Sequence, residues 1–112
     1  MGSPITTHIL DTSVGRPAAG VPVVLEFHRG DWETVGSGTT DGDGRIGDLL
    51  SEGSLECGSY RISFDTGAYW VATAVEGFYP QVQVVFTISE TEQHYHVPLL
   101  LNPFGYSTYR GS

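Results

Sequence analysis

Residues 94–112 read HYHVPLLLNPFGYSTYRGS and hold two histidines, an apolar run and three tyrosines in one short segment. In a strand over residues 94–101, side chains alternate between two faces: His94, His96, Pro98 and Leu100 on the first, and Tyr95, Val97, Leu99 and Leu101 on the second. Both faces are apolar, as in strands buried between sheets or against another subunit. We therefore expect His96 in a partly dry place that controls its pKa and tautomer, and His94 either there or at a solvated strand end. A proline within the strand indicates a sheet edge or an open place in the ladder.

The rest of the chain is broken by fifteen glycines and six prolines into short runs rich in Val, Ile, Thr, Phe and Tyr. Such runs predict an all-β protein. We expect strands near Thr6–Thr12, Val21–Arg29, Trp32–Gly38, Ser59–Phe64, Gln81–Ile88, His94–Leu101 and Tyr106–Gly111, with one more short edge strand around Arg45–Leu50. Seven or eight strands favour a two-sheet sandwich.

One segment, Thr66–Gly77, does not fit the strand pattern. It is rich in alanine, and four residues recur at helical spacing: Tyr69, Trp70, Thr73 and Ala74. The spacing predicts one short helix. We interpret its Tyr69 and Trp70 rings as packing on a sheet edge rather than as marking a site.

The length of 112 residues predicts a single domain over residues 1–112, with an ordered core from about residue 5. A hydrophobic fraction of 39% with 12% aromatic residues is sufficient for a globular core. The formal net charge of −8 makes nucleic acid a poor partner. All five basic residues are arginines, whose rigid guanidinium fork suits planar, oxygen-bearing ligands.

Cys57 is the only cysteine, so an intrachain disulfide is impossible and a reducing compartment fits. No Cys/His cluster has zinc spacing, and we expect neither a metal nor a cofactor. The N-terminal MGSPITTHIL lacks the features of a signal peptide, and no run approaches membrane-spanning length. We therefore expect a soluble, cytoplasmic protein that makes no membrane contact.

The segment Asp41-Gly42-Asp43-Gly44-Arg45 resembles the opening of an EF-hand calcium loop. That loop needs an oxygen ligand at its fifth position and glycine at its sixth, where this chain has Arg45 and Ile46. A tight turn explains the aspartates and glycines better. A tight turn does not explain why an arginine stands at position 45.

His8, in TTHILDT, shares a mixed polar strand face with Thr6, Leu10 and Thr12, and is weak evidence by itself. The chain has no G-x-S-x-G elbow and no Cys/His arrangement for covalent catalysis. What remains is two histidines and an arginine. They suit a base that activates water and a group that stabilises an oxyanion, as in the hydrolysis of an activated cyclic amide.

Three blocks carry a family resemblance: HILDTSVGRPAAGVPVVLE, TTDGDGRIGDLL and HYHVPLLLNPFGYSTYRGS. With their spacing, they make the chain resemble the transthyretin-related 5-hydroxyisourate hydrolases from about Thr6 to Ser112. The closing Tyr-Arg-Gly-Ser is the most specific part, because hormone-carrying transthyretins lack it. The resemblance implies a transthyretin-like sandwich of eight strands and one short helix, assembled as a homotetramer, a dimer of dimers with active sites in the central channel.

The resemblance also implies the site residues. His8, Arg45, His96 and Ser112 correspond to the catalytic positions, and His8, Arg45, Tyr109, Arg110 and Gly111 to the substrate-binding ones. The reactive C-terminal segment would then end inside a subunit interface with no room for a longer tail, so we expect a C-terminal tag to lower activity.

The activity implied is the ring-opening of 5-hydroxyisourate, a cyclic amide of urate catabolism, to 2-oxo-4-hydroxy-4-carboxy-5-ureidoimidazoline. We favour His96 as the base, with Ser112 orienting the water, His8 steadying the substrate or relaying a proton, Arg45 stabilising the oxyanion and Tyr109 fixing the ring. Which histidine is the base stays open. The alternative is a transthyretin-like carrier that binds a planar aromatic ligand without catalysis, and a third is an interaction module without a small-molecule site.

Overall fold

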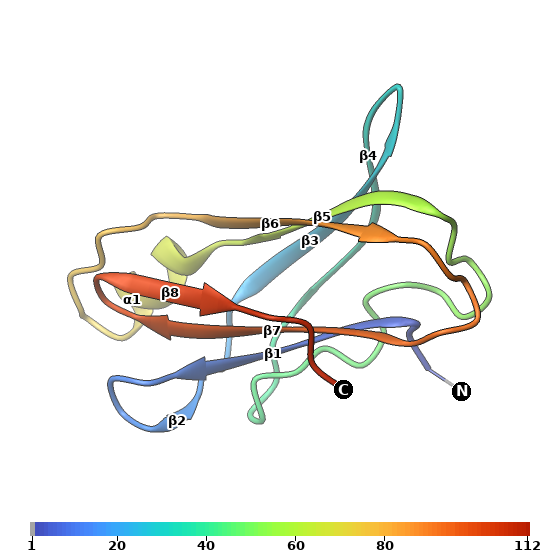
Figure 1. The fold of residues 1–112 in the computed structure, drawn as a ribbon. Coiled ribbons are helices and arrows are strands. Elements are labelled where there is room, and N and C mark those ends of the chain that lie inside the picture. Colours follow the sequence, from blue (N-terminus) through green and yellow to red (C-terminus); the bar gives the residue numbers. More distant parts are fainter. Residues whose placement is uncertain (1) are drawn as a thin grey trace.

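The computed structural model describes residues 2–112 and contains two four-stranded sheets and one helix (Figure 1). The strands are β1 (Ile5–Asp11), β2 (Arg16–Pro17), β3 (Pro22–Arg29), β4 (Asp31–Thr39), β5 (Gly58–Phe64), β6 (Val82–Ile88), β7 (Tyr95–Asn102) and β8 (Gly105–Thr108), and the helix is α1 (Thr66–Ala72). The predicted sandwich of eight strands and one short helix is confirmed. Met1, which the predicted domain includes, lies outside the described residues, and the single-domain assignment stays a prediction.

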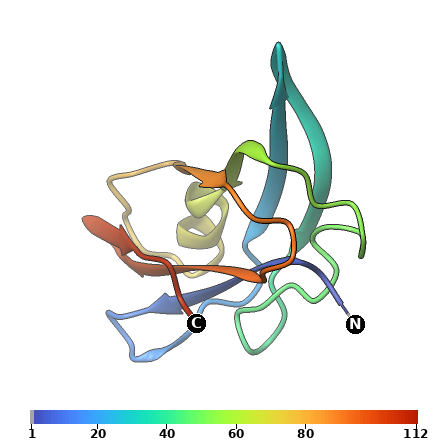
Figure 2. The same cartoon turned by 45° about the vertical axis from the view of Figure 1, so that its right-hand side comes forward.

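Strand order joins the two ends of the chain in one layer. The first sheet has the order β2-β1-β7-β8 and the second the order β4-β3-β5-β6. Strands β1 and β7 run parallel, so the blue N-terminal strand and the orange-red C-terminal strands lie side by side (Figures 1 and 2). The β3–β4 hairpin projects away from this layer (Figure 2). The first and last sequence blocks are therefore neighbours in space.

The core lies between the sheets and follows from strand alternation. Along β1, Ile5, Thr7, Ile9 and Asp11 are buried, whereas the intervening residues are half-buried. The same alternation buries every second residue of β3 and of β5. Each strand therefore presents an apolar row to the opposite sheet, and the remaining row faces outward. The candidate site residue of β1, His8, belongs to the outward row.

The eighth strand is not where the sequence placed it. The prediction of a strand around Arg45–Leu50 is wrong, and the short partner of β1 is instead β2. The segment still buries Ile46, Leu49 and Leu50. It does so as a loop in which the Leu49 carbonyl presses on Gly36 of β4, where an added Cβ would lie 1.7 Å from that oxygen. Apolar burial without ladder pairing produced the mistaken prediction.

The helix is shorter than the predicted Thr66–Gly77. It ends at Ala72, with Thr73 as its C-cap, and Ala74 takes a left-handed φ of 57°. The chain then folds back over Trp70, so closely that a Cβ on Gly77 would lie 2.1 Å from the indole. Tyr69 and Trp70 are both buried in the core. Their predicted packing role is confirmed.

Pro98 lies in a central strand, and the open-ladder interpretation is the right one. On one side Pro98 is in register with His8 of β1. On the other side, regular pairing with β8 extends only from Leu99 to Asn102, and the Thr108 hydroxyl donates to the Pro98 carbonyl. A residue without an N–H is tolerated there because the ladder does not need its hydrogen.

The seven-residue α1, the sole helix within residues 2–112, is far too short to cross a membrane.

Tyr69 makes a buried hydrogen bond that is expected to matter for stability. Its hydroxyl donates to Asp11 Oδ2 at 2.7 Å, and burial together with this carboxylate raises the pKa of Tyr69 to about 12. Replacing Tyr69 with phenylalanine leaves the buried carboxylate short of a donor. We expect the free energy of unfolding in urea to fall by about 1–3 kcal/mol. The matched Tyr106→Phe variant, at an exposed tyrosine, should change it by less than about 0.5 kcal/mol; an equal effect in both variants would contradict this role.

Candidate active site

Arg45 is positioned by the tight turn that the sequence predicted. The Asp41 carboxylate accepts hydrogen bonds from the backbone N–H groups of Asp43 and Arg45, and these bonds lower the pKa of Asp41. Gly44 has a φ of 74° and lies so close to β1 that a Cβ would meet the Ile9 carbonyl at 2.4 Å. The Ile9 N–H donates to the Gly44 carbonyl at 2.9 Å, and a backbone bridge pairs His8 with Arg45. The turn thereby fixes Arg45 beside β1.

The parallel register of β1 and β7 brings the histidines to the same surface. Thr6 is in register with His96, and His8 with Pro98. Thr6, His8 and His96 are half-buried on the outward rows, whereas His94 is exposed just before β7. Residues almost ninety positions apart in the chain therefore share one face of the sheet.

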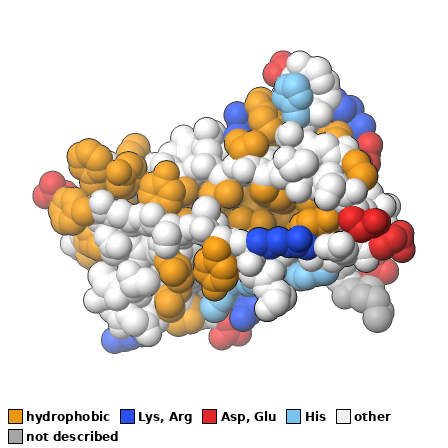
Figure 3. Space-filling view, in the orientation of Figure 1, with side chains coloured by type: hydrophobic (Ala, Val, Ile, Leu, Met, Phe, Trp, Pro, Cys, Tyr) orange, Lys and Arg blue, Asp and Glu red, His pale blue; other side chains and the backbone are white. Residues whose placement is uncertain are grey.

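A cavity of about 390 Å³ opens on this face. Its lining consists of Thr6, Thr7, Arg45, Ile46, Gly47, His94, His96 and Ser112. In Figure 3, histidine side chains in pale blue reach the surface beside blue arginine side chains on the lower side of the molecule. The lining includes no Asp or Glu side chain, although the chain carries thirteen acidic residues. The cavity is therefore suited to an electron-rich, oxygen-bearing ligand.

Burial and neighbouring positive charges act together on His96. Burial lowers its pKa below the ordinary value of 6.5, and the charges of Arg45, His8 and His94 lower it further. A neutral imidazole at neutral pH has a free lone pair and can act as a general base. The site thus holds the protonation state that the predicted role of His96 requires.

Arg45 forms no ion pair with a carboxylate within residues 2–112. The ion pairs in this part of the chain join Arg29 to Glu33 and Glu56, and Arg61 to Glu26. Arg45 is exposed and contributes to the cavity lining. Its guanidinium remains free to bind ligand oxygens or a developing negative charge.

Gly111 packs directly against the ring of His96. The Gly111 N–H donates to the His96 carbonyl at 2.8 Å, and an added Cβ would lie 2.6 Å from Cδ2 of the ring. A residue larger than glycine would therefore displace the imidazole. The next residue after Gly111 is Ser112, which lines the cavity.

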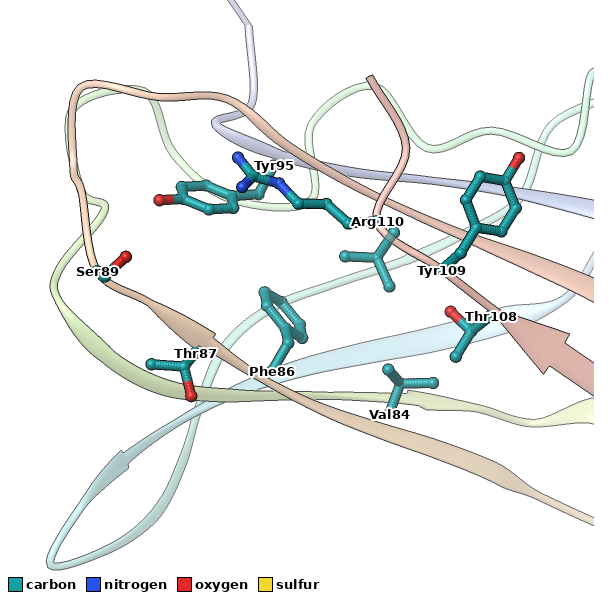
Figure 4. A pocket seen from close by; sticks show the side chains of 9 residues that line it. Val84, Phe86, Thr87, Ser89, Tyr95, Thr108, Tyr109 and Arg110 are labelled. Atoms are coloured by element: carbon teal, nitrogen blue, oxygen red, sulfur yellow. The ribbon is translucent and has the colours of Figure 1, made fainter.

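The structure does not bring every predicted site residue into this cavity. His96, Arg45 and Ser112 line it, and His8 lies beside it through its bridge to Arg45. Tyr109 and Arg110 instead line a separate pocket of about 180 Å³ between β6 and the C-terminal segment. There the Arg110 guanidinium lies 4.5 Å from the ring centroid of Tyr95, with Tyr109 at the other end of the pocket (Figure 4).

The sequence reasoning missed part of the lining. The sequence predicts Thr6 only as a member of a mixed strand face, and it does not decide between a partly dry and a solvated position for His94. The useful signal was the alternation that puts Thr6 and His8 on one face and His94 and His96 on another. Only the β1–β7 register, which the sequence does not reveal, shows that these two faces coincide.

Within residues 2–112, no group of three or more His, Cys, Asp or Glu side chains is placed to hold a metal ion.

Comparison with known proteins gives consistent matches over nearly the whole chain. The sequence profile of the HIUase/Transthyretin family matches residues 5–111. The chain is 49% identical over 109 residues to the 5-hydroxyisourate hydrolase of Salmonella dublin, covering 96% of this chain and 80% of that protein. The structure of Klebsiella pneumoniae 5-hydroxyisourate hydrolase aligns with a TM-score of 0.86 and 40% identity, over 96% of this chain and 97% of that one. Sea bream transthyretin in complex with thyroxine aligns with a TM-score of 0.92 and 36% identity, over 97% and 95%.

Proposed function

Because the chain belongs to the HIUase/Transthyretin family, we propose that it is an enzyme of that family and hydrolyses 5-hydroxyisourate. The product is the ring-opened 2-oxo-4-hydroxy-4-carboxy-5-ureidoimidazoline of urate catabolism. The observation that carries the proposal is the cavity in which the unpaired guanidinium of Arg45 and the neutral imidazole of His96 share one lining. A base and an oxyanion stabiliser are the two groups that hydrolysis of an activated cyclic amide needs.

His96 takes a proton from water as that water attacks the ring carbonyl, with the Ser112 hydroxyl orienting the water. The carbonyl oxygen becomes negatively charged, and Arg45 stabilises this charge. The tetrahedral intermediate then collapses, the carbon–nitrogen bond of the ring breaks, and the proton held by His96 passes to the leaving nitrogen. His8, beside Arg45, steadies the substrate or relays a proton.

The active site belongs to a homotetramer, a dimer of dimers. Two edge strands, β6 and β8, support this assembly, because each ends its sheet and exposes large apolar side chains, including Val85 at 60% and Tyr106 at 41%. Exposed apolar edges of this kind are usually covered by another chain. A second subunit packed over the cavity face would bring its own C-terminal residues near the site, which gives Tyr109 and Arg110 a route to substrate binding that the single chain lacks.

The enzyme acts in the cytoplasm and without a cofactor. An exposed single cysteine, Cys57, suits a reducing compartment, where a free thiol persists.

The test is an absorbance time course with 5-hydroxyisourate made fresh from urate by a urate oxidase. We expect its decay to be strongly accelerated by the protein. Thyroxine binding, measured by calorimetry on the same preparation, tests the carrier alternative. Tight hormone binding with decay at the spontaneous rate would replace hydrolysis by that alternative.

The lowered pKa of His96 sets the pH dependence of catalysis. A base must be unprotonated to act, so activity is lost as the pH falls through its pKa. We expect kcat/KM to be constant around neutrality and to fall on the acid side with a midpoint below 6.5. A His28→Gln variant, at an exposed histidine on β3, should keep the same midpoint. A midpoint above 6.5 would be incompatible with a neutral His96 base.

A further inference from the structure

The hydroxyl of Thr6 lies between two histidine rings. Its Oγ1 is 2.8 Å from Nδ1 of His96 and 3.2 Å from Nε2 of His94. A hydroxyl has one hydrogen to donate and lone pairs to accept with. It can therefore donate to one ring while accepting from the other, and its orientation decides which nitrogen of each ring carries a proton.

The direction of these hydrogen bonds matters because His96 is neutral at neutral pH. If Thr6 donates to Nδ1, the proton of His96 is on Nε2, and the ring cannot take a proton from water there. If Thr6 accepts from Nδ1–H and donates to His94, then Nε2 of His96 carries the free lone pair. Only the second arrangement leaves a basic nitrogen on the ring edge away from Thr6.

The surroundings of the ring support the second arrangement. Nδ1 is the ring nitrogen that lies against Thr6. His94 is exposed, so its ring can present an unprotonated Nε2 to the hydroxyl and keep its other nitrogen in solvent.

The fold holds this arrangement in place. Thr6 and His96 are register partners in the β1–β7 ladder, and a β-branched side chain such as threonine has few χ1 choices on a strand. On another side, the ring of His96 is confined by Gly111, where even a methyl group would collide with Cδ2. The ring therefore has little freedom to turn away from the hydroxyl.

We propose that Thr6 is a positioning residue for the hydrolysis: it accepts the Nδ1–H of His96, donates to Nε2 of His94, and so directs the basic Nε2 of His96 toward the water. This inference rests on the proposed function. The charged or titratable groups that face His96 are His8 on β1, Arg45 at the end of the Asp41 turn, and His94 just before β7. Within residues 2–112 none of them makes a hydrogen bond to Nδ1, so in this part of the chain the Thr6 hydroxyl sets the tautomer.

The test compares Thr6→Val, which keeps the β-branched shape and removes the hydroxyl, with Thr6→Ser, which keeps the hydroxyl. The matched control is Thr34→Val, at an exposed position of β4 in the other sheet. We expect Thr6→Val to lower kcat by about 10- to 100-fold, the factor carried by one hydrogen bond to a charged group, with little change in KM. Thr6→Ser should recover most of kcat, and Thr34→Val should match the wild type.

A structural readout separates positioning from simple destabilisation. Long-range ¹H–¹⁵N correlation spectra of the histidine rings should show His96 protonated on Nδ1 in the wild type and in Thr6→Ser, and a mixture of tautomers in Thr6→Val. Unchanged kcat in Thr6→Val, or a wild-type His96 protonated on Nε2, would overturn the inference. If the wild type does not accelerate decay at all, the proposed function fails and the catalytic role of Thr6 fails with it, while the spectra still report whether the hydroxyl sets the ring.

Discussion

Replacing His96 with asparagine is expected to lower kcat/KM for 5-hydroxyisourate by about 10²- to 10⁴-fold, the usual contribution of a general base. The asparagine amide can still reach the hydroxyl of Thr6, which contacts Nδ1 of the native ring. It has no group at the position of Nε2, so the water loses its base. Half-burial of His96 on an outward strand row leaves the core untouched. Activity should therefore fall without loss of the fold.

The control for this variant is His28→Asn, because His28 is exposed on β3 and contacts Trp32 rather than the cavity. Stopped-flow absorbance gives kcat/KM for both variants, and circular dichroism with size-exclusion chromatography checks fold and assembly. A His96→Asn protein with the turnover of the wild type would remove His96 from the mechanism. Equal losses in the two variants would point to general damage instead.

Replacing Arg45 with alanine is expected to reduce kcat by about 10²- to 10³-fold, the loss found when one oxyanion-stabilising donor is removed. Arg45 has no ion pair within residues 2–112, so its removal leaves no carboxylate unpaired. The turn that positions it is held by backbone N–H groups donating to Asp41, and these persist in alanine. The effect should appear in catalysis and not in stability.

Two further arginine variants sharpen this prediction. Arg45→Lys keeps the charge but loses the planar fork of donors, so its kcat should lie between those of the wild type and Arg45→Ala. Arg29→Ala removes another exposed arginine, which lies at the end of β3 and is paired with Glu56, and should leave kcat unchanged. Full kcat in Arg45→Ala would show that the oxyanion is stabilised elsewhere.

Most of the sandwich could be predicted from the sequence because the alternation of apolar and polar residues in strands, and the glycines and prolines between strands, are local signals. The strands from Ile5 to Asp11 and from Tyr95 to Asn102 were found to within one residue at each end. Glycine and proline marked the connections between the other long strands. The helix start at Thr66 agrees with the prediction from alanine content and helical spacing, and in the structure Asp65 caps it by accepting from the Ala68 N–H.

The failures come from tertiary contacts that no local pattern encodes. The two-residue strand β2 is too short to show alternation, and it forms because Leu10 and Asp11 offer a free ladder edge. Residues 45–50 look like a strand because their apolar side chains are buried, yet their backbone packs against Gly36 instead of pairing in a ladder. The end of α1 depends on the chain turning back over Trp70, which is again a packing effect.

In the candidate site, too, some features could be predicted from the sequence and others depend on tertiary contacts. The types of chemistry were readable from His8, Arg45 and His96, and the turn around Asp41 could be recognised from its composition. Thr6 was overlooked because a hydroxyl on a strand is ordinary in sequence, and only the β1–β7 register puts it between two imidazoles. The separation of Arg110 from the cavity follows from its contacts with Tyr95 and Gln93, which depend on the three-dimensional path of the C-terminal segment.

The central claim is that this protein uses water to open the ring of 5-hydroxyisourate. The most direct measurement is the rate at which ¹⁸O from labelled water enters the new carboxylate of the ring-opened product, followed by mass spectrometry with and without the protein. The account predicts that one ¹⁸O atom per product appears many times faster in the presence of the wild-type protein than in its absence. Incorporation at the spontaneous rate by a correctly folded protein would contradict it.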